Sequence, residues 1–221
     1  MKLFKQSLWI LMLSFVLSLF VGCSGSGGSS SNDDDDDTTA DTEPTVNTFN
    51  IKDNRILFGS QHTTFGDDGV ALSNTTISAS DASIVMTFDE TGAAGTFTAD
   101  VSIKLVRTNE GGTFKEITLK MPDVKFSGSA VSISLPSNTP FQVDVTFSDD
   151  SQVGASPTQS SAFSASNNQI SVNLAQVSAQ ASTVLQGNDL LEGGSYTFTL
   201  TFGSGVTIKP NNVLTGSLTV Q

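Results

Sequence analysis

The chain has 221 residues, of which 22 are acidic and 10 basic, for a formal net charge of −12. This excess of negative charge argues against nucleic-acid binding, which needs a basic surface, and against electrostatic docking onto anionic lipid. Cys23 is the only cysteine and His62 the only histidine, so an intramolecular disulfide is excluded and zinc lacks the ligands it prefers.

The chain begins with the layout of a secretion signal. Lys2 and Lys5 precede an uncharged, mostly apolar run over residues 8–21. A helix of this run is only about 21 Å long at 1.5 Å per residue, which is short for a permanent membrane span. A Gly/Ser-rich stretch follows it instead of a stop-transfer flank. We therefore predict that residues 1–22 are a cleaved signal peptide.

The residues Phe20-Val21-Gly22-Cys23 resemble the lipobox of bacterial lipoproteins, although Phe20 stands where Leu is usual. The resemblance implies cleavage after Gly22 and a diacylglyceryl group on the Cys23 thiol, so that this lipid holds the chain on a membrane. Two acyl chains are sufficient for stable anchoring. The alternative is an ordinary signal peptide that leaves Cys23 free, but Phe20 fits the small-residue pattern of such cleavage sites badly.

Residue 24 bears on the destination of the lipoprotein. In lipoproteins of many bacteria with two membranes, Asp at this position retains the protein in the inner membrane. Ser24 stands here instead. The resemblance therefore implies the outer membrane, and leaves open whether the protein faces the periplasm or the cell surface.

Residues 23–45 are rich in Gly, Ser, Asp and Thr, with five consecutive aspartates at 33–37. Such a composition buries too little apolar surface to order the chain, so we expect a disordered tether that spans roughly 25 Å. Calcium binding is an alternative, but the run lacks the turn-forming Gly of a calcium loop. The run is also similar to acidic export signals of some surface lipoproteins.

From residue 46 to 221 the dominant pattern is alternation of apolar and polar residues, which indicates half-buried strands. The apolar positions of the four longest runs are Phe97, Ala99, Val101, Ile103 and Leu105; Phe141, Val143, Val145 and Phe147; Tyr196, Phe198, Leu200 and Phe202; and Leu214, Gly216, Leu218 and Val220. Shorter strands are expected at 84–88, 117–121 and 170–174. The pattern predicts an all-β, antiparallel, immunoglobulin-like β-sandwich.

Turn-forming residues separate these runs. Glu110-Gly111-Gly112 predicts a hairpin loop. Between Val124 and Leu135 the alternation changes phase, which predicts either a bulge at Gly128 or two strands that meet there. Val177, Ala181, Val184 and Leu185 have helical spacing, which predicts one short crossover helix with Ser178 as its N-cap and Gly187 as its stop. Residues 148–168 are the candidate seam if the domain is two sandwiches.

Leu191-Glu192-Gly193-Gly194-Ser195-Tyr196 leads into a predicted strand. It resembles the tyrosine corner of immunoglobulin-like domains, where a tyrosine hydroxyl bonds back to the upstream backbone. The same run is similar to one in fimbrillin-like lipoproteins, which are lipid-anchored β-sandwiches. A generic sandwich corner is the alternative interpretation.

The sequence offers few groups for catalysis. His62 has no recognisable nucleophile motif beside it, so we expect it in a loop or at a strand end. The acidic pairs at 67–68, 89–90 and 149–150 lie beside turn residues, where caps are more common than catalytic pairs. Asp67 and Asp68, between two glycines, are the candidate calcium ligands; no other metal site and no cofactor is predicted. Asn74-Thr75-Thr76 matches a glycosylation sequon, which we interpret as a strand edge.

These observations favour a non-enzymatic, lipid-anchored envelope protein with a structural or protein-contact role. The first alternative is a subunit or anchor of a fimbrial or adhesin-type fibre that assembles by strand exchange. The second is a module that binds glycan or calcium. The expected partners are the membrane, through Cys23, and other envelope or fimbrial proteins.

Overall fold

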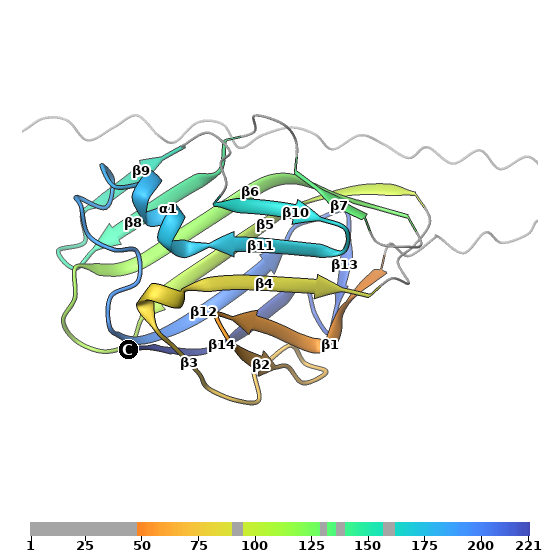
Figure 1. Ribbon diagram of the computed structural model, residues 1–221, viewed down its shortest axis with the longest axis horizontal. Helices are drawn as coiled ribbons and strands as arrows, with labels where there is room; N and C mark the ends of the chain where they lie inside the picture. Colours follow the sequence, from red (N-terminus) through yellow and green to blue (C-terminus); the bar gives the residue numbers. More distant parts are fainter. Residues whose placement is uncertain (1–47, 90–94, 129–131, 136–139, 157–161) are drawn as a thin grey trace, which may run out of the picture. The chain divides into compact units, whose positions relative to one another are not determined.

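Two β-sheets face each other in the computed structural model, which describes residues 48–89, 95–128, 132–135, 140–156 and 162–221 (Figure 1). The six-stranded sheet contains β1 (Thr48–Phe58), β2 (Gln61–Thr64), β4 (Ser83–Phe88), β10 (Phe163–Ser166), β11 (Gln169–Asn173) and β13 (Thr207–Lys209). The eight-stranded sheet contains β3 (Thr75–Ile77), β5 (Thr96–Arg107), β6 (Phe114–Ser127), β7 (Ser132–Ser134), β8 (Gln142–Phe147), β9 (Gln152–Ala155), β12 (Gly194–Phe202) and β14 (Val213–Val220). The predicted all-β sandwich is confirmed.

Most neighbouring strands are antiparallel. The order is β10-β11-β4-β1-β13 in one sheet, with β2 also on β1, and β3-β14-β12-β5-β6-β8-β9 in the other, with β7 also on β6. The pairs β1–β13 and β14–β3 are parallel. A short 3₁₀ helix, η1 (Ala79–Asp81), and α1 (Leu174–Gln180) complete the elements of the described part.

The core lies between the sheets because one face of each strand is apolar. In β12, the side chains from Tyr196 to Phe202 alternate between buried aromatic or Leu residues and more exposed Thr residues. Aromatic rings from the two sheets meet: Phe58 and Phe198 have ring centroids 4.7 Å apart. Edge-to-face and tilted contacts of this kind add to the stabilisation that burial of apolar area provides.

Gly216 occupies a core position of β14 because the ring opposite it needs the space. Gly216 pairs with Phe198 across β12 and β14. A Cβ built on Gly216 would lie only 2.6 Å from the ring of Phe198 and 2.6 Å from the Cβ of Ala71. The alternating run of β14 therefore includes a glycine where its pattern requires an apolar side chain.

The phase change after Val124 comes from a hairpin. β6 ends at Ser127, and β7 returns antiparallel to it, with Phe126 paired to Ile133. Two strands therefore meet at Gly128, as one of the two alternatives predicted. β6 also carries a bulge further upstream, where its register with β5 shifts between Ala99 and Val101.

That bulge is held by a carboxylate. Asp123 has a φ of +55°, and its N–H donates to Oδ1 of Asp100, with a distance of 3.0 Å. Pro122 precedes it and has no N–H to offer.

The predicted hairpin after β5 is confirmed, with Glu110-Gly111-Gly112 in its loop.

The predicted crossover helix exists, but its start was misplaced. α1 begins at Leu174, and Oδ1 of Asn173 accepts the N–H of Gln176 at 2.9 Å as the N-cap. The assignment of Ser178 as N-cap is wrong, because its hydroxyl donates to the carbonyl of Leu174 and accepts the N–H of Leu190. Turns continue to Gly187, whose φ of +79° ends them as predicted.

The stretch considered as a seam lies inside a single unit that extends from Thr42 to Gln221. Within this stretch, β9 belongs to the eight-stranded sheet and β10 to the six-stranded sheet. Phe163 of β10 belongs to the buried core cluster, and Ala155 of β9, which is partly buried, packs against the same cluster. No helix in the described ranges is long and apolar enough to cross a membrane.

Candidate functional site

The residues with the clearest predicted chemistry, Gly22 and Cys23, lie outside the described residues, and so does the tether with its aspartate run. Lipidation at Cys23 and cleavage after Gly22 therefore remain predictions. The acidic residue Glu90 also lies outside the described ranges. The remaining candidate residues lie in the sandwich.

Asp67 and Asp68 form a tight turn between β2 and β3. Oδ1 of Asp68 accepts the N–H of Val70 at 3.0 Å, and the N–H of Gly69 donates to the carbonyl of Gly66. Within the described ranges, no three or more His, Cys, Asp or Glu side chains are grouped so that they could hold a metal ion. The Asp68 carboxylate therefore caps a turn.

The acidic pair at 149–150 also serves a turn. Oδ1 of Asp149 accepts the N–H of Ser151 at 3.0 Å and its hydroxyl at 2.6 Å, and these bonds lower the pKa of Asp149. Asp150 pairs with Nζ of Lys115 at 2.5 Å, which raises the pKa of Lys115. Each of the two carboxylates has its own local partner, as solvated turn residues do.

Tyr196 makes the hydrogen bond that the resemblance implied. Its hydroxyl donates to the backbone carbonyl of Glu192 at 2.8 Å, and Nη1 of Arg107 donates to the same hydroxyl at 2.8 Å. Arg107 also donates to the carbonyl of Gly193 at 2.6 Å and reaches the Glu192 carboxylate at 3.3 Å. That carboxylate accepts the N–H of Thr113 at 2.7 Å.

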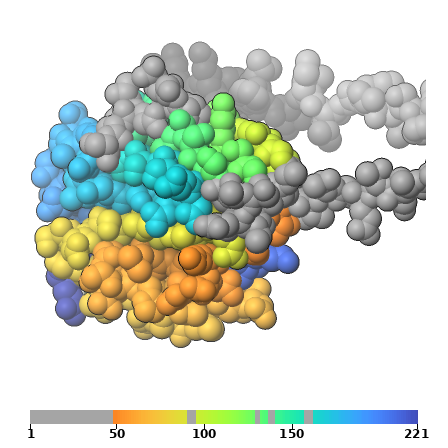
Figure 2. Space-filling model, turned by 45° about the vertical axis from the view of Figure 1, so that its right-hand side comes forward, coloured from red at the N-terminus to blue at the C-terminus, as the bar shows by residue number. Residues whose placement is uncertain are grey.

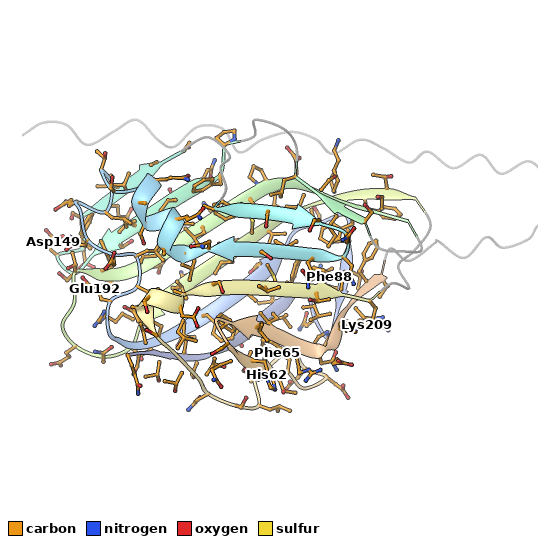
Figure 3. All side chains as sticks on the ribbon, viewed as in Figure 1. His62, Phe65, Phe88, Asp149, Glu192 and Lys209 are labelled. Carbon is orange, nitrogen blue, oxygen red and sulfur yellow. The ribbon has the colours of Figure 1, made fainter. Side chains whose placement is uncertain are left out.

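This cluster joins the loop before β12 to the hairpin between β5 and β6. The Arg107 side chain is only 8% exposed, and its guanidinium lies 5.3 Å from the centroid of the Tyr196 ring. Burial raises the pKa of Tyr196, and the Arg107 charge partly opposes this rise. Glu192 lies at the end of the sandwich opposite Lys209 (Figure 3). Nε of Arg107 is buried without a hydrogen-bond partner, but both of its terminal nitrogens donate within the corner, so we interpret the cluster as a structural lock.

His62 lies within β2, where it pairs with Leu57 of β1 and is exposed on the outer face of the six-stranded sheet. The prediction of a loop or strand-end position was close, since β2 is only four residues long.

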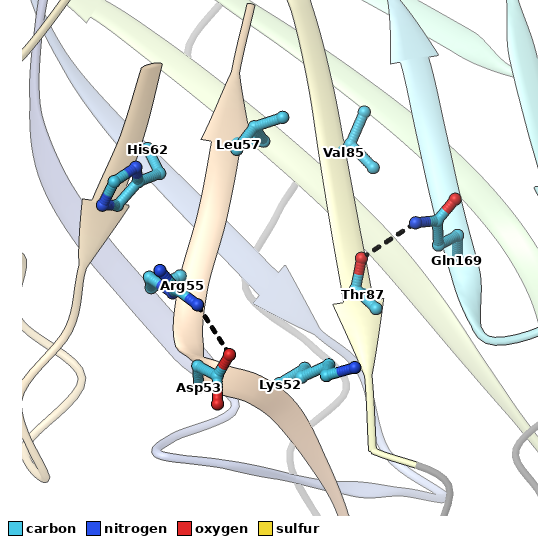
Figure 4. A pocket seen from close by; sticks show the side chains of 8 residues that line it. All are labelled: Lys52, Asp53, Arg55, Leu57, His62, Val85, Thr87 and Gln169. Atoms are coloured by element: carbon cyan, nitrogen blue, oxygen red, sulfur yellow. Dashed lines mark hydrogen bonds and ion pairs between the residues drawn. The ribbon is translucent and has the colours of Figure 1, made fainter. Parts of the chain in front are cut away.

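His62 is one lining residue of a hollow on this face (Figure 4). The others are Lys52, Asp53, Arg55, Leu57, Val85, Thr87 and Gln169, and the cavity volume is about 480 Å³.

A bulge in β1 shapes this hollow. Ile51 pairs with Phe88 of β4, but the next paired residue, Ile56, faces Met86, so residues 52–55 all stand opposite Thr87. Asp53 and Asn54 have φ values of +54° and +51°. Asp and Asn tolerate this left-handed conformation better than other side chains with a Cβ.

The bulge has two consequences. β1 keeps apolar residues buried on both sides of it, at Ile51 and at Ile56, although their parity differs. It also places the side chains of Lys52 and Arg55 beside the hollow. Bulges frequently re-aim side chains in this way next to functional sites.

The floor of the hollow is aliphatic and its margin is polar. Leu57 pairs with Val85 across β1 and β4, and Leu57 is 41% exposed. On one side, Nε2 of Gln169 donates to the hydroxyl of Thr87 at 3.1 Å. In the space-filling view, the surfaces of β1 and β2 adjoin those of β4 and β11 on one continuous face (Figure 2).

The charges around the hollow are mostly positive. Nη2 of Arg55 pairs with Oδ2 of Asp53 at 2.6 Å, and both side chains are about half exposed, so water screens the pair. Lys52 is exposed and has no ion-pair partner among the described residues. A cationic margin is notable on a chain with 22 acidic residues.

A second hollow of about 470 Å³ lies on the other side of the same bulge, with Asp53, Asn54, Asp67, Asp89 and Lys209 among its lining residues. Its three aspartates do not form a metal-binding group. The bulge therefore separates a mainly cationic hollow from a mainly acidic one.

The bulge and the hollow were not predicted from the sequence. The sequence does contain an indication of the bulge: the buried apolar residues of this strand change from odd positions, Phe49 and Ile51, to even positions, Ile56 and Phe58, across Asp53-Asn54.

Comparison with known proteins adds no further assignment, since no family model, curated protein or solved structure matches the chain.

Proposed function

We propose that this protein is a lipid-anchored component of the bacterial cell envelope whose sandwich acts without catalysis, through structural or protein contacts. The observation that carries the proposal is the Phe20–Cys23 motif at the end of a signal-like segment. The outer membrane is the proposed location, because Ser24 follows the cysteine. The sandwich supports the contact role, since it presents a broad, mixed polar and aliphatic sheet face with a preformed hollow.

The anchor is tested by replacing its thiol. In cells fed an alkyne-tagged fatty acid, the wild-type protein should take up the label and sediment with membranes. Cys23→Ala should lose the label and leave the outer-membrane fraction, whereas the control Ser26→Ala should behave as wild type. Membrane retention of Cys23→Ala without label would contradict the lipid anchor.

A second experiment separates the two possible orientations. Protease added to intact cells should degrade the sandwich if it faces outward and spare it if it faces the periplasm. Protease added after the outer membrane is permeabilised serves as the control for a cleavable protein. This measurement is independent of the anchor test.

A second candidate function, a fibre subunit joined by strand addition, is favoured by β9. In the described ranges, this four-residue strand pairs with β8 on one side and with no strand on the other, and its Val153 is 41% exposed. Exposed, apolar edge strands are templates for pairing with another chain.

Two valines of matched exposure test the fibre function. Val153→Lys should abolish any SDS-resistant ladder that the full-length protein forms, because a charge on the edge opposes pairing. Val213→Lys changes a residue of β14 that is 42% exposed and should leave the ladder intact. A wild-type protein that remains monomeric at high concentration would rule out the fibre function.

A further inference from the structure

We propose that the hollow beside the β1 bulge binds an extended acidic segment of a partner protein, in which an aliphatic residue lies between two carboxylates. The inference rests on the proposed contact function and names the partner's chemistry. It concerns the surface lined by Lys52, Arg55, Leu57, His62 and Val85, below called the β1 hollow.

The charge distribution selects a negative ligand. Two of the lining side chains, Lys52 and Arg55, are cationic, and one, Asp53, is acidic. On the outer face of the eight-stranded sheet, two lysines are matched to acids, Lys104 to Glu116 at 2.9 Å and Lys120 to Asp144 at 2.9 Å. In the β1 hollow, by contrast, Lys52 has no ion-pair partner among the described residues, so a carboxylate that binds there gains a cation that is not already paired.

The aliphatic floor selects the second feature of the ligand. Leu57 and Val85 are direct cross-strand neighbours, so their side chains form one apolar contact between polar margins. In an extended peptide, residues two apart point to the same face and lie roughly 7 Å from each other. An aliphatic side chain can thus cover Leu57 and Val85 while a carboxylate two residues away reaches Lys52 or Arg55.

The same features favour a peptide over a sugar chain. Platforms for sugars generally use Trp or Tyr faces, and the lining residues of the β1 hollow include no Trp, Tyr or Phe. The polar pair Thr87–Gln169 offers a hydroxyl and an amide at the margin, which suit a peptide backbone. An acidic sugar chain is the alternative that the experiment must distinguish.

The backbone of the bulge is consistent with a preformed site. Two consecutive non-glycine residues, Asp53 and Asn54, hold left-handed conformations, and the carbonyl of Asn54 accepts the N–H of Phe65 at 3.0 Å. Such conformations persist where surrounding bonds fix them, and they concentrate at binding sites. Lys52 and Arg55 flank these two residues, so the bonds that fix the bulge also position both cations.

The test uses full-length protein in a neutral detergent and a fluorescein-labelled peptide with the core Asp-Ser-Leu-Ser-Asp, followed by fluorescence anisotropy. Binding should weaken as salt rises. Lys52→Gln combined with Arg55→Gln should weaken binding at least ~10-fold, since two charge-assisted contacts are lost. The matched control, Lys104→Gln combined with Lys120→Gln, removes the same charge from the other sheet and should leave the affinity unchanged.

Two single variants keep the test independent of folding defects in the double variant. Leu57→Ser should weaken binding roughly 5-fold through loss of apolar contact. Asp53→Asn should strengthen binding by about 3-fold, because it removes the one negative charge and releases Arg55, and because Asn tolerates the positive φ. A residue with a purely structural role would not produce such a gain.

Three results would overturn the inference. Equal loss in the control double variant would show general charge attraction. Equal binding of a peptide with Asn for both Asp residues would remove the need for carboxylates. Binding of polygalacturonate, but not of the peptide, would assign the hollow to an acidic sugar chain. In each case, fatty-acid labelling at Cys23 reports separately on the anchor, so loss of the inference leaves the envelope function standing.

Discussion

Removing a single oxygen from the tyrosine corner should measurably destabilise the sandwich. In Tyr196→Phe, the carbonyl of Glu192 and one N–H of Arg107 lose a partner, each at 2.8 Å in the wild type. Tyr196 is only 4% exposed, so water does not easily replace the hydroxyl. A net hydrogen bond contributes about 1 kcal/mol, and a buried group left unsatisfied costs more. Arg107 keeps its bond to Gly193, so we expect a total loss of about 2 kcal/mol.

Urea unfolding followed by far-ultraviolet circular dichroism measures this loss. With a slope of about 2 kcal/mol/M, the midpoint should fall by about 1 M, and the melting temperature by roughly 4–8 °C. The control is Thr197→Val, an exposed neighbour on the same strand, whose effect should stay within about 0.5 kcal/mol. A midpoint for Tyr196→Phe equal to that of this control would refute our account of the corner.

The same variant isolates a pH effect. Burial raises the pKa of Tyr196, with partial opposition from Arg107. Below the ordinary tyrosine pKa of about 10, the phenol is protonated in both folded and unfolded chains, so its contribution is fully present. As pH rises from there through the raised folded pKa, the unfolded chain ionises first and stability falls. Because the chain has one tyrosine, phenolate absorbance follows it directly. Tyr196→Phe should lose less stability than wild type over this range; an equal loss would exclude Tyr196 as its source.

Three further changes test the packing and the caps. Gly216→Ala should destabilise by about 1–3 kcal/mol in urea unfolding because its Cβ would strike Phe198, and adding Phe198→Leu should recover part of this loss; additive losses would contradict the clash. Asn173→Ala removes the N-cap of α1 and should cost about 1 kcal/mol, and a midpoint unchanged from wild type would argue against this cap. Asp100→Ala removes the acceptor for Asp123 and should speed amide exchange of that N–H, whereas unchanged exchange would show that the bulge does not need it.

The sequence was sufficient to predict the fold class and the long strands, because one face of each long strand is buried and the other is exposed to solvent. β5, β8, β12 and β14 all coincide with alternating runs. The strand edge expected at Asn74-Thr75-Thr76 overlaps β3, an edge strand, but the three-residue strand β13 was not predicted, since three residues carry no readable period. Their position depends on parallel pairing with strands far away in the chain.

The errors have local physical causes. Ser178 looked like an N-cap because Ser is common there, but its hydroxyl donates to the Leu174 carbonyl in the helix and accepts the N–H of Leu190 in the loop beyond it. The β1 hollow was missed because residues 52–55 are polar and resemble a turn between strands. In the structure they are an interruption inside a single strand, held by β2, β4 and β13, and none of these pairings is visible in residues 52–55 themselves.

The position of β1 determines how tension would enter the sandwich. With the proposed anchor at Cys23, a pull on a bound partner is resisted through the chain that enters β1 at Thr48. β1 pairs with β4 on one side and with β13 and β2 on the other, and the bonds of its antiparallel pairs with β4 and β2 run perpendicular to the strand. A pull along β1 therefore loads these bonds together, in shear, instead of opening them one after another. The strand that carries the bulge is thus also the one through which mechanical force would pass.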